Sequence, residues 1–185
     1  MLKKADVRWV FRVVVWSIAL AVLVTLLSYA AFEETAYVLA FGLLFVLIVL
    51  GIVFDMVAVA VMAADATPFH SMAAHRGRGG KEAIRLIKNA DRVASFCSDV
   101  VGDIAGIISG TTMAAIAIRL TQDFSLSSLV VNLIITSLVV GLTIGGKAWG
   151  KIVAIRGSEK IVLFAALIIW RKNWIRDKIF RSSAR

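Results

Sequence analysis

Long apolar stretches constrain this chain more than any other feature. No charged residue occurs in 13–32 or in 37–54, and about 20 apolar residues in a helix cross the ~30 Å hydrocarbon core of a bilayer. The chain is 60% hydrophobic, its mean hydropathy is +0.89, and it contains a single proline. These values exceed those of a soluble domain of the same size. We therefore predict an all-α, polytopic membrane helix bundle.

The positions of the basic residues predict how the bundle is oriented. We expect four spans at 10–32, 36–63, 94–118 and 128–146, the first of them a retained helix because its apolar stretch is longer than the core of a typical signal peptide. All but one of the 21 Lys and Arg residues then lie in 1–12, 65–92 or 147–185. By the positive-inside rule, both termini are cytoplasmic and the protein lies in the plasma (inner) membrane. The net charge of +9 is expected to face anionic lipid headgroups, not nucleic acid.

Three regions follow from this arrangement: an N-terminal helix in 1–35, a transmembrane domain in 36–160 with a cytoplasmic loop at 65–92, and a basic interfacial helix in 161–185. Within the loop, 81–96 alternates apolar and basic residues at helical spacing, which predicts an amphipathic helix on the inner leaflet. The apolar run 161–170 is too short to cross a membrane. It is expected to lie at the membrane surface.

Three aspartates interrupt the apolar segments and are the candidate metal ligands. Asp99 and Asp103 lie one helical turn apart in the third span, and Asp55 lies in the second. A carboxylate inside a membrane costs roughly 2.5–3.5 kcal/mol on insertion scales, so it usually marks an ion path, a proton relay or a paired charge. Carboxylate and hydroxyl oxygens are suitable ligands for Mg²⁺. We expect Asp103 to be the central ligand, Asp99 and Asp55 to support it, Ser98 to add a hydroxyl, and Lys147 to be a fixed countercharge.

Glycines in the third span predict close helix packing. Gly102, Gly106 and Gly110 recur every four residues, which lines one face with small residues and lets another helix approach. Together with Asp99 and Asp103 they form a small, polar stripe that cannot face lipid. We expect this face to mediate tight helix contact, and a homodimer to form through the bundle.

From Phe54 onward, the order of motifs resembles the transmembrane domain of the CNNM/CorC family of magnesium transporters. The stretch Arg85–Arg92 (RLIKNADR) is similar to the family's Arg-Leu-x-x-Asn-Pro-x-Arg, with Ala90 in the proline position. The stretch Gly146–Lys151 (GKAWGK) keeps the first glycine and the last lysine of Gly-Glu-x-x-Pro-Lys, and Glu159 follows that lysine at the family's spacing. The resemblance covers about 54–180. It implies a Mg²⁺ transporter, Na⁺ coupling and a homodimer.

The chain departs from the family pattern at several positions. Asp55 stands where the first serine of the family's Ser-x-Ser-Glu would fall, and Lys147 stands in place of the closing glutamate. The family's ion-site residues are therefore not carried over to this chain. We also expect the chain to add the N-terminal helix and to lack the paired CBS regulatory modules that usually follow.

Three functions are compatible with these residues. A divalent-cation transporter would use the aspartates as oxygen ligands, with no enzymatic step. A non-transporting structural or regulatory membrane protein would pair them with Lys147 or Arg119 to hold the bundle together. An intramembrane aspartyl protease would share a proton between Asp55 and Asp103 to activate water, although Val100 replaces the first glycine of the Gly-x-Gly-Asp signature.

Overall fold

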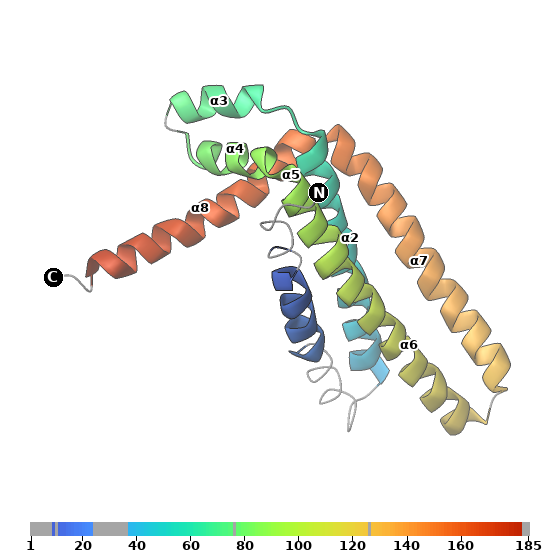
Figure 1. Cartoon of the computed structure of the whole chain (residues 1–185). Coiled ribbons are helices and arrows are strands. Elements are labelled where there is room, and N and C mark those ends of the chain that lie inside the picture. The colour runs from blue at the N-terminus through green and yellow to red at the C-terminus, as the bar shows by residue number, and fades with distance from the viewer. Residues whose placement is uncertain (1–8, 10, 24–36, 76, 126, 183–185) are drawn as a thin grey trace.

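The computed structural model describes residues 9, 11–23, 37–75, 77–125 and 127–182, with side chains described up to residue 172. Every secondary-structure element in these ranges is helical, which confirms the all-α prediction (Figure 1). In chain order they are α2 (Tyr37–Ala63), α3 (Thr67–Ala74), α4 (Gly80–Lys88), α5 (Ala90–Ser95), the π-helix η1 (Phe96–Gly102), α6 (Asp103–Phe124), α7 (Ser128–Arg156) and α8 (Ser158–Ser182).

Three helices within the described ranges are long and apolar enough to cross a membrane: Tyr37–Ala63, Ala90–Phe124 and Ser128–Arg156. The shortest has 27 residues and therefore spans about 40 Å at 1.5 Å per residue. They correspond to the second, third and fourth predicted spans. Of the first predicted span, 10–32, the structure describes the apolar helix Phe11–Leu23, and residues 24–32 lie outside the described ranges.

Two helix boundaries differ from the prediction. The amphipathic helix expected at 81–96 ends at Lys88, because the Asn89 side-chain amide donates a hydrogen bond of 2.8 Å to the Arg85 carbonyl and the backbone turns there. The third spanning helix consequently begins at Ala90. The fourth spanning helix continues through the two consecutive glycines at 145–146 and ends at Arg156.

Glycines on α7, rather than those predicted in the third span, make the closest approach between helices. A Cβ on Gly146 would clash with Ile52 of α2, and one on Gly150 would lie 2.8 Å from Met56 of the same helix. A Cβ on Gly106 or Gly110 would meet none of the described residues within 4 Å. Among these residues, Gly106 and Gly110 therefore do not make the predicted tight contact, whereas the Gly102 carbonyl oxygen lies 3.8 Å from the position of a Cβ on Gly51 of α2.

Helix α2 lies at the centre of the bundle, between α6 and α7, and it also contacts α5, η1 and α8 (Figure 1). At one end of the bundle, α3, α4 and α8 pack over the end of α2. Their shared core consists of Ala60, Val61, Phe69, Ala83, Ala154, Val162 and Ala166. Ala83 is fully buried there, so the apolar face of α4 packs against protein.

The opposite end of the bundle joins α2 to α6 through polar contacts. The Tyr37 hydroxyl donates a short hydrogen bond to an Asp123 carboxylate oxygen. The Arg119 guanidinium lies over the Tyr37 ring, 5.6 Å from its centroid. Arg119 is thus engaged at this end, and the prediction that it pairs with the membrane aspartates is not supported.

Candidate functional site: a polar groove between α2, α5 and η1

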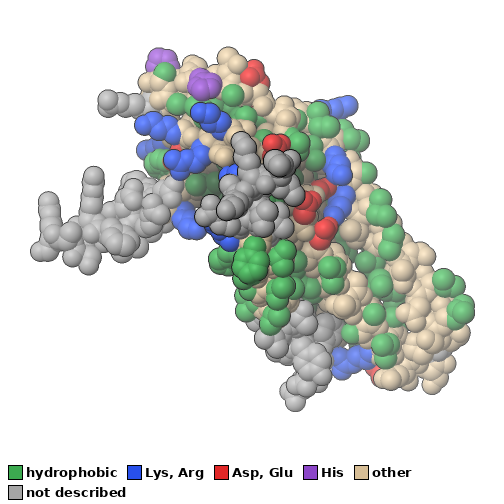
Figure 2. Space-filling model, viewed as in Figure 1, with side chains coloured by type: hydrophobic (Ala, Val, Ile, Leu, Met, Phe, Trp, Pro, Cys, Tyr) green, Lys and Arg blue, Asp and Glu red, His purple; other side chains and the backbone are tan. Residues whose placement is uncertain are grey.

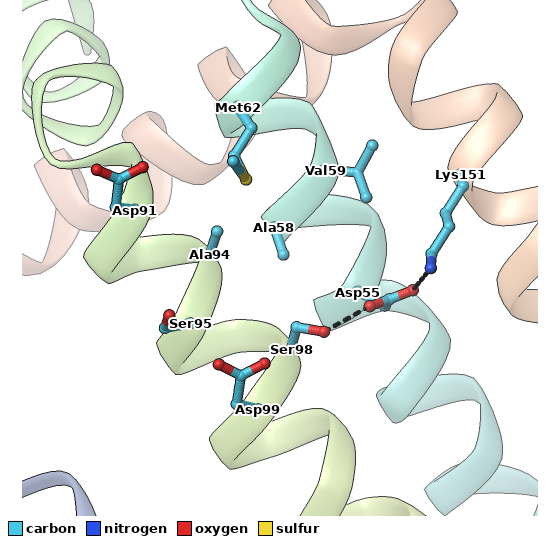
Figure 3. A pocket seen from close by; sticks show the side chains of 10 residues that line it. All are labelled: Asp55, Ala58, Val59, Met62, Asp91, Ala94, Ser95, Ser98, Asp99 and Lys151. Carbon is cyan, nitrogen blue, oxygen red and sulfur yellow. Dashed lines mark hydrogen bonds and ion pairs between the residues drawn. The ribbon is translucent and has the colours of Figure 1, made fainter. Parts of the chain in front are cut away.

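A cavity of about 340 Å³ opens between α2 and the α5–η1 segment, near the end of the bundle that α3 and α4 cover. Figure 3 shows its lining. Most of the polar side chains come from α5 and η1, whereas α2 supplies one carboxylate and α7 supplies one ammonium group. The lining residues are Asp55, Ala58, Val59, Met62, Asp91, Ala94, Ser95, Ser98, Asp99 and Lys151.

Asp55 is the most buried polar group of this groove, with 5% of the residue exposed. Its Oδ1 accepts a hydrogen bond of 2.8 Å from the Ser98 hydroxyl. Its Oδ2 is buried and accepts no hydrogen bond from the described residues, while the Lys151 ammonium lies 3.7 Å away. A buried carboxylate oxygen without a hydrogen bond is costly. Asp55 therefore presents one oxygen that an additional cation or water could satisfy.

The π-helix η1 places Ser98 opposite Asp55. It covers Phe96–Gly102 and lies between the α-helical segments α5 and α6 without a break in the spanning helix. A π-helix has a wider turn than an α-helix, so it changes the direction in which the following side chains point, and such segments are frequent at functional sites. Side chains on either side of η1 consequently do not share the face that regular α-helical spacing predicts.

The open side of the groove carries a row of oxygen-bearing side chains. Asp91, Ser95 and Asp99 follow one another at four-residue spacing and all line the cavity (Figure 3). Asp91 and Asp99 are exposed, in contrast to Asp55. The groove thus runs from exposed carboxylates at its mouth to a buried carboxylate on α2.

The structure brings together three of the five residues predicted from the sequence. Asp55, Asp99 and Ser98 all line the groove. Asp103, the first residue of α6, is exposed and is not part of the lining. Lys147 is also absent from the lining; its Nζ lies 4.0 Å from the position of a Cβ on Gly102.

Three lining residues were missed by the sequence argument: Asp91, Ser95 and Lys151. The four-residue spacing of Asp91, Ser95 and Asp99 was a usable signal, but Asp91 was counted with the amphipathic helix instead of the spanning helix. Lys151 lies one turn after Lys147 on α7, and it makes the ion pair that we expected of Lys147. The helix had to continue past Gly146 for this lysine to reach α2.

The charges of the groove favour a cation that keeps part of its water shell. With all groups ionised, three carboxylates and one ammonium give the lining a net charge of −2. Among the residues described, however, no three His, Cys, Asp or Glu side chains lie close enough to enclose a metal ion. Mg²⁺ usually binds through one or two carboxylates and keeps several waters. A partly hydrated divalent cation therefore suits the groove better than a bare one.

The fold and the groove define a class: an α-helical membrane protein with an acidic, oxygen-lined groove inside its bundle. The family model for the cyclin M transmembrane N-terminal domain matches residues 42–176, and the chain belongs to this family. The match confirms the resemblance inferred from the motifs, and it includes every residue of the groove. The family is one of membrane proteins associated with divalent-cation transport rather than with catalysis. Comparisons with curated proteins and with solved structures gave no match.

Proposed function

We propose that this chain binds a divalent cation, Mg²⁺ first, in the groove at Asp55 and moves it across the membrane. The observation that carries the proposal is the buried Asp55 Oδ2, which accepts no hydrogen bond from the described residues. A charged group in a spanning helix is stable only if it is compensated. Ser98 satisfies one oxygen of this carboxylate, and a cation in the groove would satisfy the other.

Lys151 supports a mechanism in which a side chain and the transported ion alternate. Its ammonium lies 3.7 Å from Asp55 Oδ2, and its side chain is 53% exposed. An ammonium that is half in solvent can leave at much lower cost than a fully buried one. In this mechanism the cation enters past Asp91 and Asp99, reaches Asp55, and displaces Lys151, which returns when the ion leaves.

The wider proposal includes Na⁺ coupling, a homodimer, and a plasma (inner) membrane location with both termini in the cytoplasm. Na⁺ coupling follows from the family resemblance, and Na⁺ would bind to the same hard oxygen ligands. The orientation follows from the distribution of basic residues. The homodimer is supported by the open glycine stripe on α6, where a Cβ on Gly106 or Gly110 would meet none of the described residues within 4 Å. A bilayer with anionic headgroups would be the lipid partner.

Flux measurements in proteoliposomes test this proposal. Wild-type protein should move Mg²⁺ into vesicles that contain a Mg²⁺-sensitive dye. Asp55→Asn, which preserves shape and removes the charge, should reduce the rate at least about tenfold, because one charge-assisted contact contributes about 1.5–3 kcal/mol. Asp103→Asn is the matched control and should retain most of the rate. If wild-type protein moves no Mg²⁺, or if both variants equal it, the proposal fails.

One observation favours a second function, that of a non-transporting structural protein. The ion pair between Asp55 and Lys151 joins α2 to α7, so it could serve only to hold these helices together. This version differs from the sequence prediction in its lysine, since Lys151 takes the role expected of Lys147. It predicts that Lys151→Gln loosens the bundle and that Mg²⁺ has no effect on stability. The protease alternative has no comparable support, because Asp103 does not line the described groove in which Asp55 lies.

A further inference from the structure

A second cavity, of about 620 Å³, lies outside the spanning bundle, between the loop that joins α3 to α4 and the helix α8. Its lining combines a glycine-rich turn with two basic side chains and one tryptophan. The lining residues are Ala73, Gly77, Arg78, Gly79, Lys81, Glu82 and Trp170. None of them lines the groove at Asp55, so this cavity is separate from the proposed cation path.

Arg78 contacts an aromatic ring. Its guanidinium lies over the Trp170 ring, 5.6 Å from the centroid, which is within the range of a cation–π interaction. Such a contact leaves the N–H groups of the guanidinium able to donate hydrogen bonds. The fork of N–H donors on an arginine matches the oxygens of a phosphate or a carboxylate. Arg78 is exposed and is therefore an accessible anion-binding group at the wall of this cavity.

The turn beside Arg78 has a shape that only glycine permits. Gly79 has φ +82°, and a Cβ on Gly80 would lie 2.9 Å from the backbone nitrogen of Ala73. A Cβ on Gly77 would similarly lie 2.9 Å from the Met72 carbonyl oxygen. Because of these close approaches, the loop packs tightly against α3. Arg78 and Lys81 both line the cavity beside it.

The turn leads directly into the N-terminus of α4. No described side chain caps this helix, whose N-cap residue is Gly79. An uncapped helix start attracts negative charge through its free N–H groups. In this cavity that attraction adds to the charges of Arg78 and Lys81, and Glu82 is the one acidic group among the described lining residues.

The surface around this cavity is basic as well. Lys81, Arg85 and Lys88 are exposed along α4, and Arg171 and Lys172 are exposed directly after Trp170 on α8. Blue side chains gather over this part of the molecule in Figure 2. On α8, Phe164 and Ile168 are 67% and 57% exposed, so an apolar surface adjoins the basic one. Tryptophan beside basic and apolar groups is typical of the membrane–water interface.

We propose that this cavity binds a phosphate group, and that its natural source is the headgroup of an anionic membrane lipid. Arg78 and Lys81 contact the phosphate oxygens, Trp170 contacts the Arg78 guanidinium, and the acyl chains lie along the apolar side of α8. The proposal concerns a single site with a defined geometry, beyond the general attraction of a basic surface to an anionic bilayer. It does not depend on cation transport at Asp55.

Native mass spectrometry of the full chain in detergent, titrated with phosphatidylglycerol, tests the proposal. The double variant Arg78→Gln/Lys81→Gln should weaken binding of the first lipid by about tenfold or more, because two charge-assisted contacts are lost. The matched control is Arg85→Gln/Lys88→Gln, which makes the same change in charge on α4, outside the cavity. It should change the affinity by no more than about twofold, since only diffuse attraction is lost. Equal weakening by both double variants would overturn the proposal, and so would no weakening by either.

Two further arms complete the test. Trp170→Leu keeps an apolar side chain but removes the ring under Arg78; it should weaken binding about threefold, and it stands in if the Gln double variant fails to fold. Inorganic phosphate and glycerol 1-phosphate, used as competitors, distinguish the source of the phosphate. If they displace the lipid at millimolar concentration, a soluble phosphate ester can serve as the ligand; if they do not, the site requires a lipid.

Discussion

Lys151 and Asp55 form an ion pair between side chains of very different exposure, 53% and 7%. The burial of this ion pair is intermediate between that of a surface pair and that of a fully buried pair. We therefore expect it to contribute about 1–2 kcal/mol to stability. Because Oδ2 accepts no hydrogen bond from the described residues, the pair leaves that oxygen incompletely satisfied. Lys151 therefore competes with a bound cation for the same oxygen.

Replacing this lysine gives a prediction with a definite sign. Lys151→Gln removes the competing ammonium and makes the lining more negative, so the affinity for Mg²⁺ should rise about tenfold, or about 1.4 kcal/mol. Without Mg²⁺, the melting temperature should fall, because the buried Asp55 carboxylate then has no cationic partner and keeps only the hydrogen bond from Ser98. Calorimetric titration and thermal melts measure the two effects.

Lys147→Gln is the matched control, one turn earlier on α7 and outside the groove. It should leave both the Mg²⁺ affinity and the melting temperature almost unchanged. A lower melting temperature with an unchanged Mg²⁺ affinity in Lys151→Gln would contradict competition and favour the structural role of the pair.

The carboxylates of the site could be predicted from the sequence, but their relative importance as ligands could not. Asp55, Ser98 and Asp99 were identified because polar groups in an apolar span are costly. Asp103 was expected to be the central ligand, but it does not line the groove that Asp99 lines. The third span also contains the π-helix Phe96–Gly102, and no feature of FCSDVVG predicts it.

Helix α3 offers a pH prediction, because its start depends on Asp65. The carboxylate accepts hydrogen bonds from the Thr67 backbone N–H at 3.0 Å and from the Thr67 hydroxyl at 2.9 Å. These hydrogen bonds lower the pKa of Asp65 below its usual value. Because the pKa of Asp65 is lower in the folded than in the unfolded chain, the ionised carboxylate stabilises the helix start at pH values above the pKa of the unfolded chain. This stabilisation is lost as the pH falls through the pKa of the folded chain. The start of α3 should therefore loosen below about pH 4.

Hydrogen exchange at the α3 amides, corrected for the intrinsic effect of pH, measures this loosening. Asp65→Asn cannot titrate, so its α3 protection should not change over the same range. A fall of equal size in wild type and variant would exclude Asp65 as the cause.

The elements also show why boundaries were harder to predict than the spans themselves. Hydropathy was sufficient to find α2 and the two later spans. A segment that crosses the bilayer needs apolar side chains facing lipid and backbone hydrogen bonds within the segment, and a long apolar helix provides both. The end of α4 depends on one side-chain hydrogen bond from Asn89. The continuation of α7 depends on Gly146 and Gly150 packing against α2. Both are tertiary or local contacts that periodicity does not reveal.

For the whole molecule, the open glycine stripe on α6 is the proposed contact with a second copy. A Cβ on Gly106 or Gly110 would meet none of the described residues within 4 Å, so Gly106→Leu/Gly110→Leu should leave the fold intact but separate the two copies. Light scattering of the purified protein should then show a monomer where the wild type is a dimer. The control Gly141→Leu/Gly145→Leu places the same bulk at open positions on α7 and should remain dimeric. A monomeric wild type, or a dimer unaffected by the α6 substitutions, would contradict the proposal.

Equilibrium binding of Mg²⁺ tests the central claim, that Asp55 holds the cation in the groove between α2, α5 and η1. Isothermal titration of the purified wild type, Asp55→Asn and Asp103→Asn compares the buried and the exposed carboxylate directly. We predict that the wild type binds Mg²⁺, that Asp55→Asn weakens binding at least about tenfold, and that Asp103→Asn stays within about threefold. Binding that survives in Asp55→Asn and disappears in Asp103→Asn would contradict the account.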